Sequence, residues 1–158
     1  MTGELQTELK QPVAFRSREA EVFLNVLRTS SSLMGDLVEL LRPHDLTQPQ
    51  YNVLRILRGA GAEGLPRGEV GERMVAREPD VTRLLDRMEA RGIVRRDRGT
   101  GDRRVVRVTI TVEGRRLVDS LDGVVADMHV RQLGHLSDDE LTVLNDLLVR
   151  ARTRPGAG

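Results

Sequence analysis

The chain contains no cysteine and no tryptophan, and the only aromatic side chains among its 158 residues are Phe15, Phe23 and Tyr51. Without cysteine there is no disulfide bond, no thiolate nucleophile, no thiolate zinc site and no cysteine redox sensor. Three aromatic residues are too few for a surface that stacks successive bases of a single strand. The composition therefore excludes thiol chemistry and argues against single-stranded nucleic acid as a ligand.

Long hydrophobic runs are also missing. Runs such as 124–126 fall far short of the ~20 apolar residues of a membrane-spanning helix, and residues 1–11 lack the apolar stretch of a secretory signal. Hydrophobic residues make up 39% of the chain, a share typical of globular proteins. We therefore predict a soluble, cytoplasmic protein with no membrane partner, folded as one unit or as two small units sharing a core.

Side chains suited to catalysis or metal binding are sparse. His44, His129 and His135 are the only histidines, and none belongs to a His-Glu-x-x-His pattern. His129 and His135 could meet across a helix end to hold a metal, but surface histidines are the more usual interpretation. The glycines at 59 and 61 follow a helical pattern instead of a strand, unlike those of a phosphate-binding loop. We predict no enzymatic activity, no metal and no cofactor.

Positive charge is concentrated in one segment. The net charge is only +1, but residues 77–107 hold ten Arg against six Asp and Glu, a local charge of +4, whereas the remainder carries −3. Of the 25 basic residues 24 are arginine, whose planar fork suits phosphate and guanine. Skewed codon usage would also produce an arginine excess, so the clustering is the stronger indication that this segment meets nucleic acid.

Hydrophobic periodicity and turn residues predict six helices and one small hairpin. The first helix has apolar positions at intervals of three, four and seven and ends near Pro43. The predicted helices span 19–43, 48–59, 68–74, 79–91, 112–133 and 138 to about 152, and the predicted strands span 93–96 and 105–110. On the helix at 79–91 the predicted inward side chains are Val81, Leu84, Leu85 and Met88. Local residues support these boundaries: Pro79 suits a first helical turn, Gly92 a left-handed stop, Thr111 an N-cap, and Ser137 with Glu140 a capping box.

Two short helices followed by a basic hairpin are in the order of a winged helix-turn-helix, whose second helix enters the major groove of DNA. On the second helix Arg83 and Arg87 share the solvent-facing side and could each fork onto a guanine or clasp a phosphate. Thr82 could meet a phosphate or a thymine methyl group. The alternative is a solvated face of helical ion pairs, such as Asp80 with Arg83.

Asp80 is unusual on a helix that faces DNA, because phosphates repel a carboxylate. It would be tolerated if it accepted a hydrogen bond from a cytosine amine or oriented Arg83, and the sequence leaves both open. The hairpin is simpler to interpret, since a tip so rich in arginine favours phosphate or a narrow minor groove. Its charged residues are Arg95, Arg96 and Arg98 on the first strand and Asp102, Arg103 and Arg104 at the start of the second, with Asp102 bracing Arg104.

The motif at 81–94, Val-Thr-Arg-Leu-Leu-Asp-Arg-Met-Glu-Ala-Arg-Gly-Ile-Val, continues with Asp-Arg-Arg at 102–104 and Val-Thr-Ile-Thr-Val-Glu-Gly at 108–114. In these segments the chain resembles the MarR family of bacterial winged-helix transcriptional regulators, and the resemblance extends over about residues 23–151. Pro66-Arg67-Gly68 and Glu78-Pro79-Asp80 depart from the family pattern, which usually has Ser or Thr at these helix starts.

The resemblance implies a homodimer that binds a pseudo-palindromic double-stranded operator, usually represses transcription, and often releases DNA when a small aromatic or anionic ligand binds. It places DNA contacts at Thr82, Arg83, Arg87, Arg103 and Arg104, with Asp102 as a brace. Together with the residues discussed above, the predicted DNA-binding set is Asp80, Thr82, Arg83, Arg87, Arg98, Asp102, Arg103 and Arg104.

The residues by themselves also favour dimerisation, because the apolar stripes of the first helix and of the last two are too long for one thin lobe to cover. The predicted fold is therefore mainly α with a β-hairpin wing. Its parts are a flexible arm (1–18), a helical dimerisation region (19–45 and 112–152), a winged helix-turn-helix (46–111) and a disordered tail (153–158).

A ligand cleft is expected where the first two helices meet the winged lobe, near Leu33, Leu37, His44, Tyr51 and Arg67. Core and rim are the more usual interpretation of the same residues. Two rival functions remain: a ligand-binding or protein-interaction module that has lost operator recognition, suggested by the acidic Glu78 and Asp80, and non-specific architectural DNA binding. The sequence leaves open the operator, the regulated genes, and whether transcription falls or rises on binding.

Overall fold

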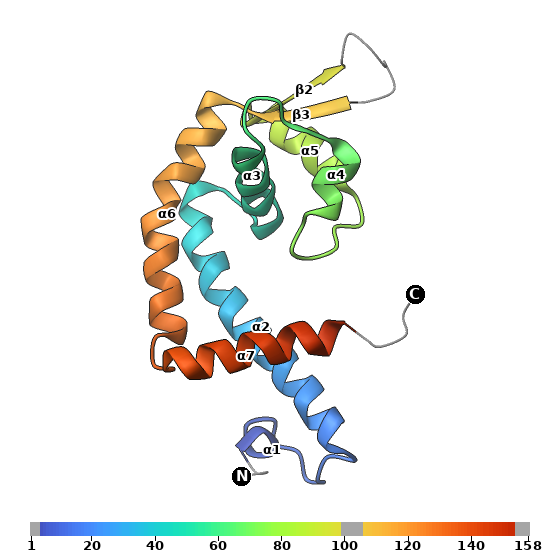
Figure 1. Ribbon diagram of the computed structural model, residues 1–158, viewed down its shortest axis with the longest axis vertical. Helices are drawn as coiled ribbons and strands as arrows, with labels where there is room; N and C mark the ends of the chain where they lie inside the picture. The colour runs from blue at the N-terminus through green and yellow to red at the C-terminus, as the bar shows by residue number, and fades with distance from the viewer. Residues whose placement is uncertain (1–3, 99–105, 154–158) are drawn as a thin grey trace. The chain divides into compact units, whose positions relative to one another are not determined.

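The computed structural model describes residues 4–98 and 106–153, and these are mainly helical with a small antiparallel sheet (Figure 1). The chain divides after Gln48 into two compact units, residues 1–48 and 49–158. The predicted fold class, a mainly α chain with a β-hairpin wing, is confirmed. Within the described ranges no helix combines the length and hydrophobicity that crossing a membrane requires.

The first unit is built on one long helix. Its elements are α1 (Glu4–Glu8), α2 (Arg18–Leu41) and the 3₁₀ helix η1 (Arg42–His44). Helix α2 begins where the Ser17 hydroxyl accepts a hydrogen bond from the amide of Ala20, at 3.2 Å. Helix α2 ends at Leu41 and η1 continues to His44, so the predicted helix that ends near Pro43 is confirmed. The range 1–18, predicted to be a flexible arm, contains α1, whose Leu5 is buried and whose Glu8 lies 3.5 Å from Arg28 of α2.

The second unit holds the remaining elements. These are α3 (Gln48–Ala60, beginning one residue before the boundary), β1 (Leu65–Pro66), α4 (Arg67–Glu72), α5 (Val81–Ala90), β2 (Val94–Arg98), β3 (Val106–Ile110), α6 (Val112–Leu133) and α7 (Asp138–Arg152). Figure 1 shows α4 and α5 gathered beside the β2–β3 hairpin. Helix, short loop, helix and hairpin is the arrangement of a winged helix-turn-helix.

The sheet has a third strand that the sequence pattern did not predict. Strand β1 pairs antiparallel with β3, opposing Leu65 to Val108, and β3 pairs with β2, opposing Ile110 to Val94. Gly64, with φ of +58°, brings the chain to this pairing, and a Cβ there would lie 2.2 Å from the carbonyl oxygen of Val108. Two residues are too few to show a period of two, so β1 is defined only by its partner strand.

The core of the second unit lies between α3, the two helix-turn-helix helices, the sheet and the first half of α6. Its fully buried side chains are Val53, Leu54, Leu57, Val70, Leu84, Leu85, Met88, Val94, Val108, Val118 and Leu121. The predicted inward residues Leu84, Leu85 and Met88 of α5 are confirmed. On α6, Val118, Leu121, Val125 and Met128 form the buried face, whereas Val124 is exposed.

Three helix boundaries follow from local chemistry. The Thr111 hydroxyl accepts a hydrogen bond from the Gly114 amide and caps α6, and Ser137 with Glu140 forms a capping box for α7. Gly92 follows α5 with φ of +71°. All three predictions are confirmed. Helix α7, by contrast, buries none of its apolar side chains within the described chain.

Candidate nucleic-acid interface

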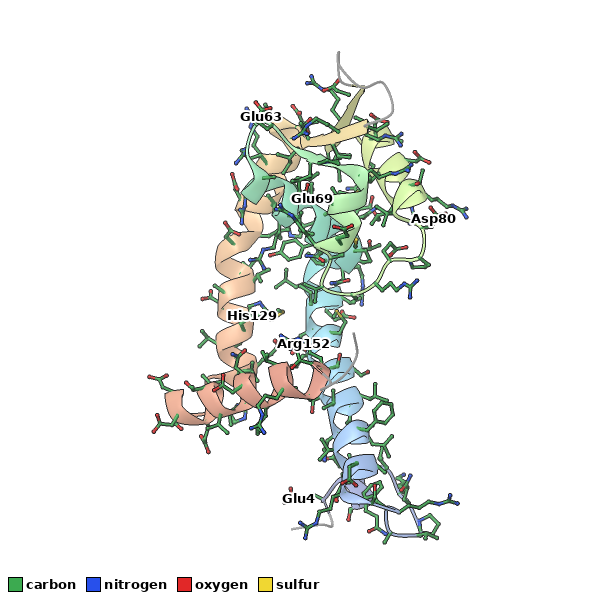
Figure 2. All side chains as sticks on the ribbon, turned by 45° about the vertical axis from the view of Figure 1, so that its right-hand side comes forward. Glu4, Glu63, Glu69, Asp80, His129 and Arg152 are labelled. Carbon is green, nitrogen blue, oxygen red and sulfur yellow. The ribbon has the colours of Figure 1, made fainter. Side chains whose placement is uncertain are left out.

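Helix α5 starts later than predicted, because Asp80 is its N-cap. The Asp80 Oδ1 atom accepts a hydrogen bond from the main-chain N–H of Arg83 at 2.9 Å, so Pro79 lies outside the helix instead of in its first turn. Figure 2 shows Asp80 at the outer edge of the second unit, where the loop joins α5. A carboxylate at this position satisfies a free amide and interacts favourably with the helix dipole. Asp80 therefore orients the Arg83 main chain, and no Asp80–Arg83 ion pair occurs in the described chain.

The face of α5 opposite its buried residues is cationic. Thr82, Arg83 and Arg87 are all exposed, and within residues 4–98 and 106–153 no ion pair engages either arginine. The Thr82 hydroxyl accepts a hydrogen bond at 3.3 Å from Arg67, the first residue of α4. The structure thus brings together Asp80, Thr82, Arg83 and Arg87 of the predicted set on one helix.

The two acidic residues of α5 are paired with the wing. Arg96 of β2 contacts Asp86 at 2.6 Å and Glu89 at 2.5 Å. Hydrogen bonds from Arg96 lower the pKa of the Glu89 carboxyl, and hydrogen bonding to Glu89 raises the pKa of the Arg96 guanidinium. The sequence could not reveal this cluster, since the heptad-like pattern of α5 places Asp86 and Glu89 on its polar side without saying what lies beside them.

Two other arginines of the hairpin also form ion pairs or hydrogen bonds within the protein. Arg95 pairs with Asp97 at 2.9 Å, and Arg107 donates to the carbonyl oxygens of Glu63 and Gly64 at 2.9 and 3.1 Å. Neighbouring carboxylates therefore compensate the charges of Arg95 and Arg96, and the expectation that the wing arginines meet phosphate stays a prediction. Arg98 ends β2, and its side chain lies outside the described part, as do Asp102, Arg103 and Arg104.

A second cluster of charged residues joins α3 to α6. The guanidinium of Arg58 lies 2.7 Å from both Asp119 and Asp122, and its second amine nitrogen donates to Asp122 at 2.9 Å. These hydrogen bonds from Arg58 hold the pKa of the Asp122 carboxyl below its usual range. The cluster fixes α3 against the first half of α6. Its partners are more than 60 residues apart in sequence, so no local pattern indicates them.

The five predicted ligand residues are distributed over both units. Leu33 and Leu37 lie half-buried on α2, and His44 is exposed in η1. Tyr51 is buried on α3, and Arg67 is exposed on α4. Burial raises the pKa of the Tyr51 phenol. The cleft they were predicted to line therefore stays a prediction.

An open concavity of about 750 Å³ lies elsewhere, at the root of the wing, and none of these five residues lines it. Among its lining residues are Arg95, Thr109, Glu113, Arg115 and Arg116.

Comparison with known proteins gives a consistent result. Residues 46–106 match the family model described as MarR family. The chain is 36% identical over 118 residues to the HTH-type transcriptional regulator TtmR of Methylorubrum extorquens (strain PA1), an alignment covering 71% of this chain and 60% of that regulator. It is 39% identical to a MarR transcription factor from Planctomyces limnophilus, with a TM-score of 0.66 and coverage of 85% of this chain and 97% of that one.

The fold also matches that of a MarR variant from E. coli crystallised with operator DNA. The TM-score is 0.77 at 24% identity, and the match covers 96% of this chain and 100% of that chain. At this identity the likeness establishes the fold.

Proposed function

Because the chain belongs to the MarR family of transcriptional regulators, we propose that it acts as a homodimer that binds a specific double-stranded DNA operator and controls transcription there. The observation that carries the proposal is the exposed face of α5. It presents two arginines without an ion-pair partner among the described residues, on a helix whose other face is anchored in the core. Helices placed in this way insert into the major groove.

In this proposal Arg83 and Arg87 make the base contacts. Each guanidinium can donate two hydrogen bonds to the O6 and N7 atoms of a guanine, the pairing that distinguishes G·C in the major groove. Thr82, held by Arg67 at the start of α5, is placed for a phosphate or a thymine methyl group. Asp80 serves by capping the helix. Arg98, Arg103 and Arg104, with Asp102 as a brace, would contact phosphates or the adjacent minor groove from the wing.

Dimerisation is proposed from the unburied apolar residues of α2 and α7. On α7, Leu144, Leu147 and Leu148 are exposed, as are Phe23 and Leu27 on α2. Single exposed apolar residues are ordinary, but continuous helical stripes of them mark an interface. We therefore assign 19–45 and 112–152 to the dimer interface. A two-fold dimer would recognise half-sites about one helical turn, ~10 bp, apart.

The DNA-binding proposal is tested by selecting duplexes from a random pool and titrating the enriched sequence by fluorescence anisotropy. Arg83→Ala and Arg87→Ala are each expected to lose ~1–3 kcal/mol of binding free energy and to relax selectivity at one base pair. Arg16→Ala, at an exposed position outside both the winged helix-turn-helix and the proposed dimer interface, is the control and should bind like the wild type. If every duplex binds weakly and without salt dependence at low ionic strength, the proposal fails.

The dimer proposal has its own test. Leu147, 52% exposed, is replaced by Glu, which should give a monomer in sedimentation velocity and abolish tight operator binding. Val13→Glu is the matched control, since Val13 is 73% exposed and lies outside the proposed interface. If the Leu147→Glu protein stays dimeric, α7 is not part of the dimer interface.

Ligand control is the finer part of the proposal. A small aromatic or anionic effector is proposed to bind near Leu33, Leu37, His44, Tyr51 and Arg67 and to release the operator, so that the protein acts as a repressor. Thermal-shift screening with phenolic and other aromatic acids, followed by operator-release assays, tests this. A complete lack of stabilisation and release would argue against it. A cytoplasmic location and the absence of enzymatic activity stay predictions.

The rival of a module without operator recognition rested on Glu78 and Asp80. Asp80 has a structural role as the α5 cap, and Glu78 lies within 3.5 Å of the Asp80 amide. Hydrogen bonds at the start of α5 therefore explain why acidic residues stand at these two positions, and neither acid implies that DNA binding has been lost. Enrichment of a palindrome in the selection would exclude this rival, and equal affinity for scrambled duplexes would instead support architectural binding.

A further inference from the structure

Arg96 of β2 is held more tightly than any other wing arginine that the structure describes. Its Nε atom donates to Glu89 Oε2 at 2.8 Å and its Nη1 atom lies 2.6 Å from Asp86 Oδ1. Its main-chain N–H donates to the second Glu89 oxygen at 2.9 Å. The Arg96 side chain is only 24% exposed. Glu89 thus accepts hydrogen bonds from both the main chain and the side chain of Arg96.

This cluster connects the helix proposed to read bases with the strand that leads to the wing tip. Asp86 and Glu89 are three residues apart and therefore share a side of α5. Leu85 and Met88, their neighbours in sequence, are fully buried and anchor the helix in the core. A displacement of β2 relative to α5 would break several charge-assisted hydrogen bonds together, so the cluster constrains the wing.

Arg96 also changes the charge that α5 presents. Between Val81 and Ala90 the helix carries Arg83 and Arg87 against Asp86 and Glu89, and has no net charge. The third arginine, from the strand, pairs with both acids, which leaves the positive charges of Arg83 and Arg87 uncompensated on the exposed face. An unpaired carboxylate on the same helix would repel phosphates.

We infer that Arg96 and Glu89 are positioning residues for operator recognition: they set the spacing of wing and recognition helix and do not themselves touch DNA. The inference rests on the proposed function. It makes a prediction opposite to that of simple electrostatics. Removing the Glu89 carboxylate takes a negative charge out of a DNA-binding surface, and by charge alone this change should tighten DNA binding. If Glu89 positions the wing, losing its hydrogen bonds to Arg96 should instead weaken DNA binding.

The experiment compares Glu89→Ala, Glu89→Gln and Arg96→Gln on the full chain, with affinity for the selected operator measured at several salt concentrations. Glu89→Ala is expected to bind about 10-fold more weakly, and the double variant Glu89→Ala with Arg96→Gln to lose no more than either alone. Glu89→Gln, which keeps an acceptor oxygen, should recover part of the loss. Glu72→Ala, the removal of an exposed acid on α4, is the control and should bind equally well or slightly more tightly.

The salt dependence separates positioning from direct contact. If Arg96 contacts a phosphate, Arg96→Gln should make the plot of the logarithm of the association constant against the logarithm of salt concentration less steep by about 0.9. If Arg96 is a positioning residue, the steepness should not change. Glu89→Ala binding as tightly as the wild type, or a lowered slope in Arg96→Gln, overturns the inference.

Hydrogen exchange keeps this test independent of the proposed function. In free protein, Glu89→Ala should speed amide exchange at Arg96 and along β2, and Glu72→Ala should not. If the wild type selects no operator, the proposed function fails, and the exchange rates alone decide whether the cluster holds the wing: faster exchange supports the connection and unchanged exchange overturns it.

Discussion

Replacing Gly114 by alanine is expected to destabilise the protein, although alanine is the better helix former. Gly114 is the third residue of α6, and its amide donates to the Thr111 cap at 3.0 Å. A Cβ at this position would lie 2.1 Å from the carbonyl oxygen of Ile93 and 3.1 Å from a side-chain carbon of Ile110. That carbonyl also accepts the main-chain N–H of Thr111. The obstacle is therefore a hydrogen-bonded backbone group that cannot rotate away.

The magnitude follows from two opposing effects. Alanine in place of glycine inside a helix contributes about 1 kcal/mol to stability. Inserting a carbon into a packed site costs 1–3 kcal/mol, and an approach as close as 2.1 Å to backbone places the cost near ~3 kcal/mol. The net expectation is a loss of ~2 kcal/mol. For a chain of this size such a loss lowers Tm by about 4–8 °C.

The assay is thermal unfolding followed by circular dichroism at one fixed protein concentration, because dimerisation makes Tm concentration-dependent. Gly59→Ala, in α3 and outside the proposed dimer interface, is the control. An added Cβ there meets nothing within 4 Å, so Tm should rise by about 2–4 °C. A Gly114→Ala protein that melts at or above the wild-type temperature would refute the packing argument.

Three further predictions concern stability. Leu85→Ala removes a fully buried side chain and should lower the free energy of unfolding by ~2–5 kcal/mol in urea titrations; a loss of less than ~1 kcal/mol would contradict its core position. Thr111→Ala removes the α6 cap and the hydroxyl's hydrogen bond to Gly92 O, and should cost ~1 kcal/mol by the same assay, with no change speaking against the cap. The lowered pKa of Asp122, caused by hydrogen bonds from Arg58, means that its stabilising contribution is present above its ordinary pKa of 3.8 and is lost as pH falls through the lower folded pKa. Asp122→Asn should therefore melt below the wild type at neutral pH, and the two curves should converge in acid; a gap independent of pH would exclude the ion pair as its cause.

Local chemistry made several parts of this protein predictable from sequence. Thr111, and Ser137 with Glu140, were identified as helix caps because a capping hydroxyl and the amide it accepts from are only three residues apart. The glycine after α5 is predictable as a left-handed stop because glycine adopts a positive φ without a steric penalty. The buried positions of α5 followed from a helical period that repeats within ten residues. In each case the interacting groups lie within one or two turns of chain.

Asp80 shows where local reasoning reached its limit. Its proximity to the start of the helix was evident, but a shift of two residues in the boundary changed it from a helical surface acid to the N-cap. The pattern of apolar residues constrains the middle of a helix, whereas its first residue depends on which side chain captures the free amides.

The amino-acid sequence by itself determined the order of the longer helices and the hairpin strands, the caps of α6 and α7, the cationic face of α5 and the family to which the chain belongs. Only the tertiary structure decided that Leu65 and Pro66 form a strand, that Arg96 is paired with Asp86 and Glu89, and that Arg58 bridges to α6. The physical reason is the range of the interactions. Periodicity and capping act between neighbours along the chain, but an arginine's partner and a two-residue strand are set by side chains and backbone that folding brings together from distant positions.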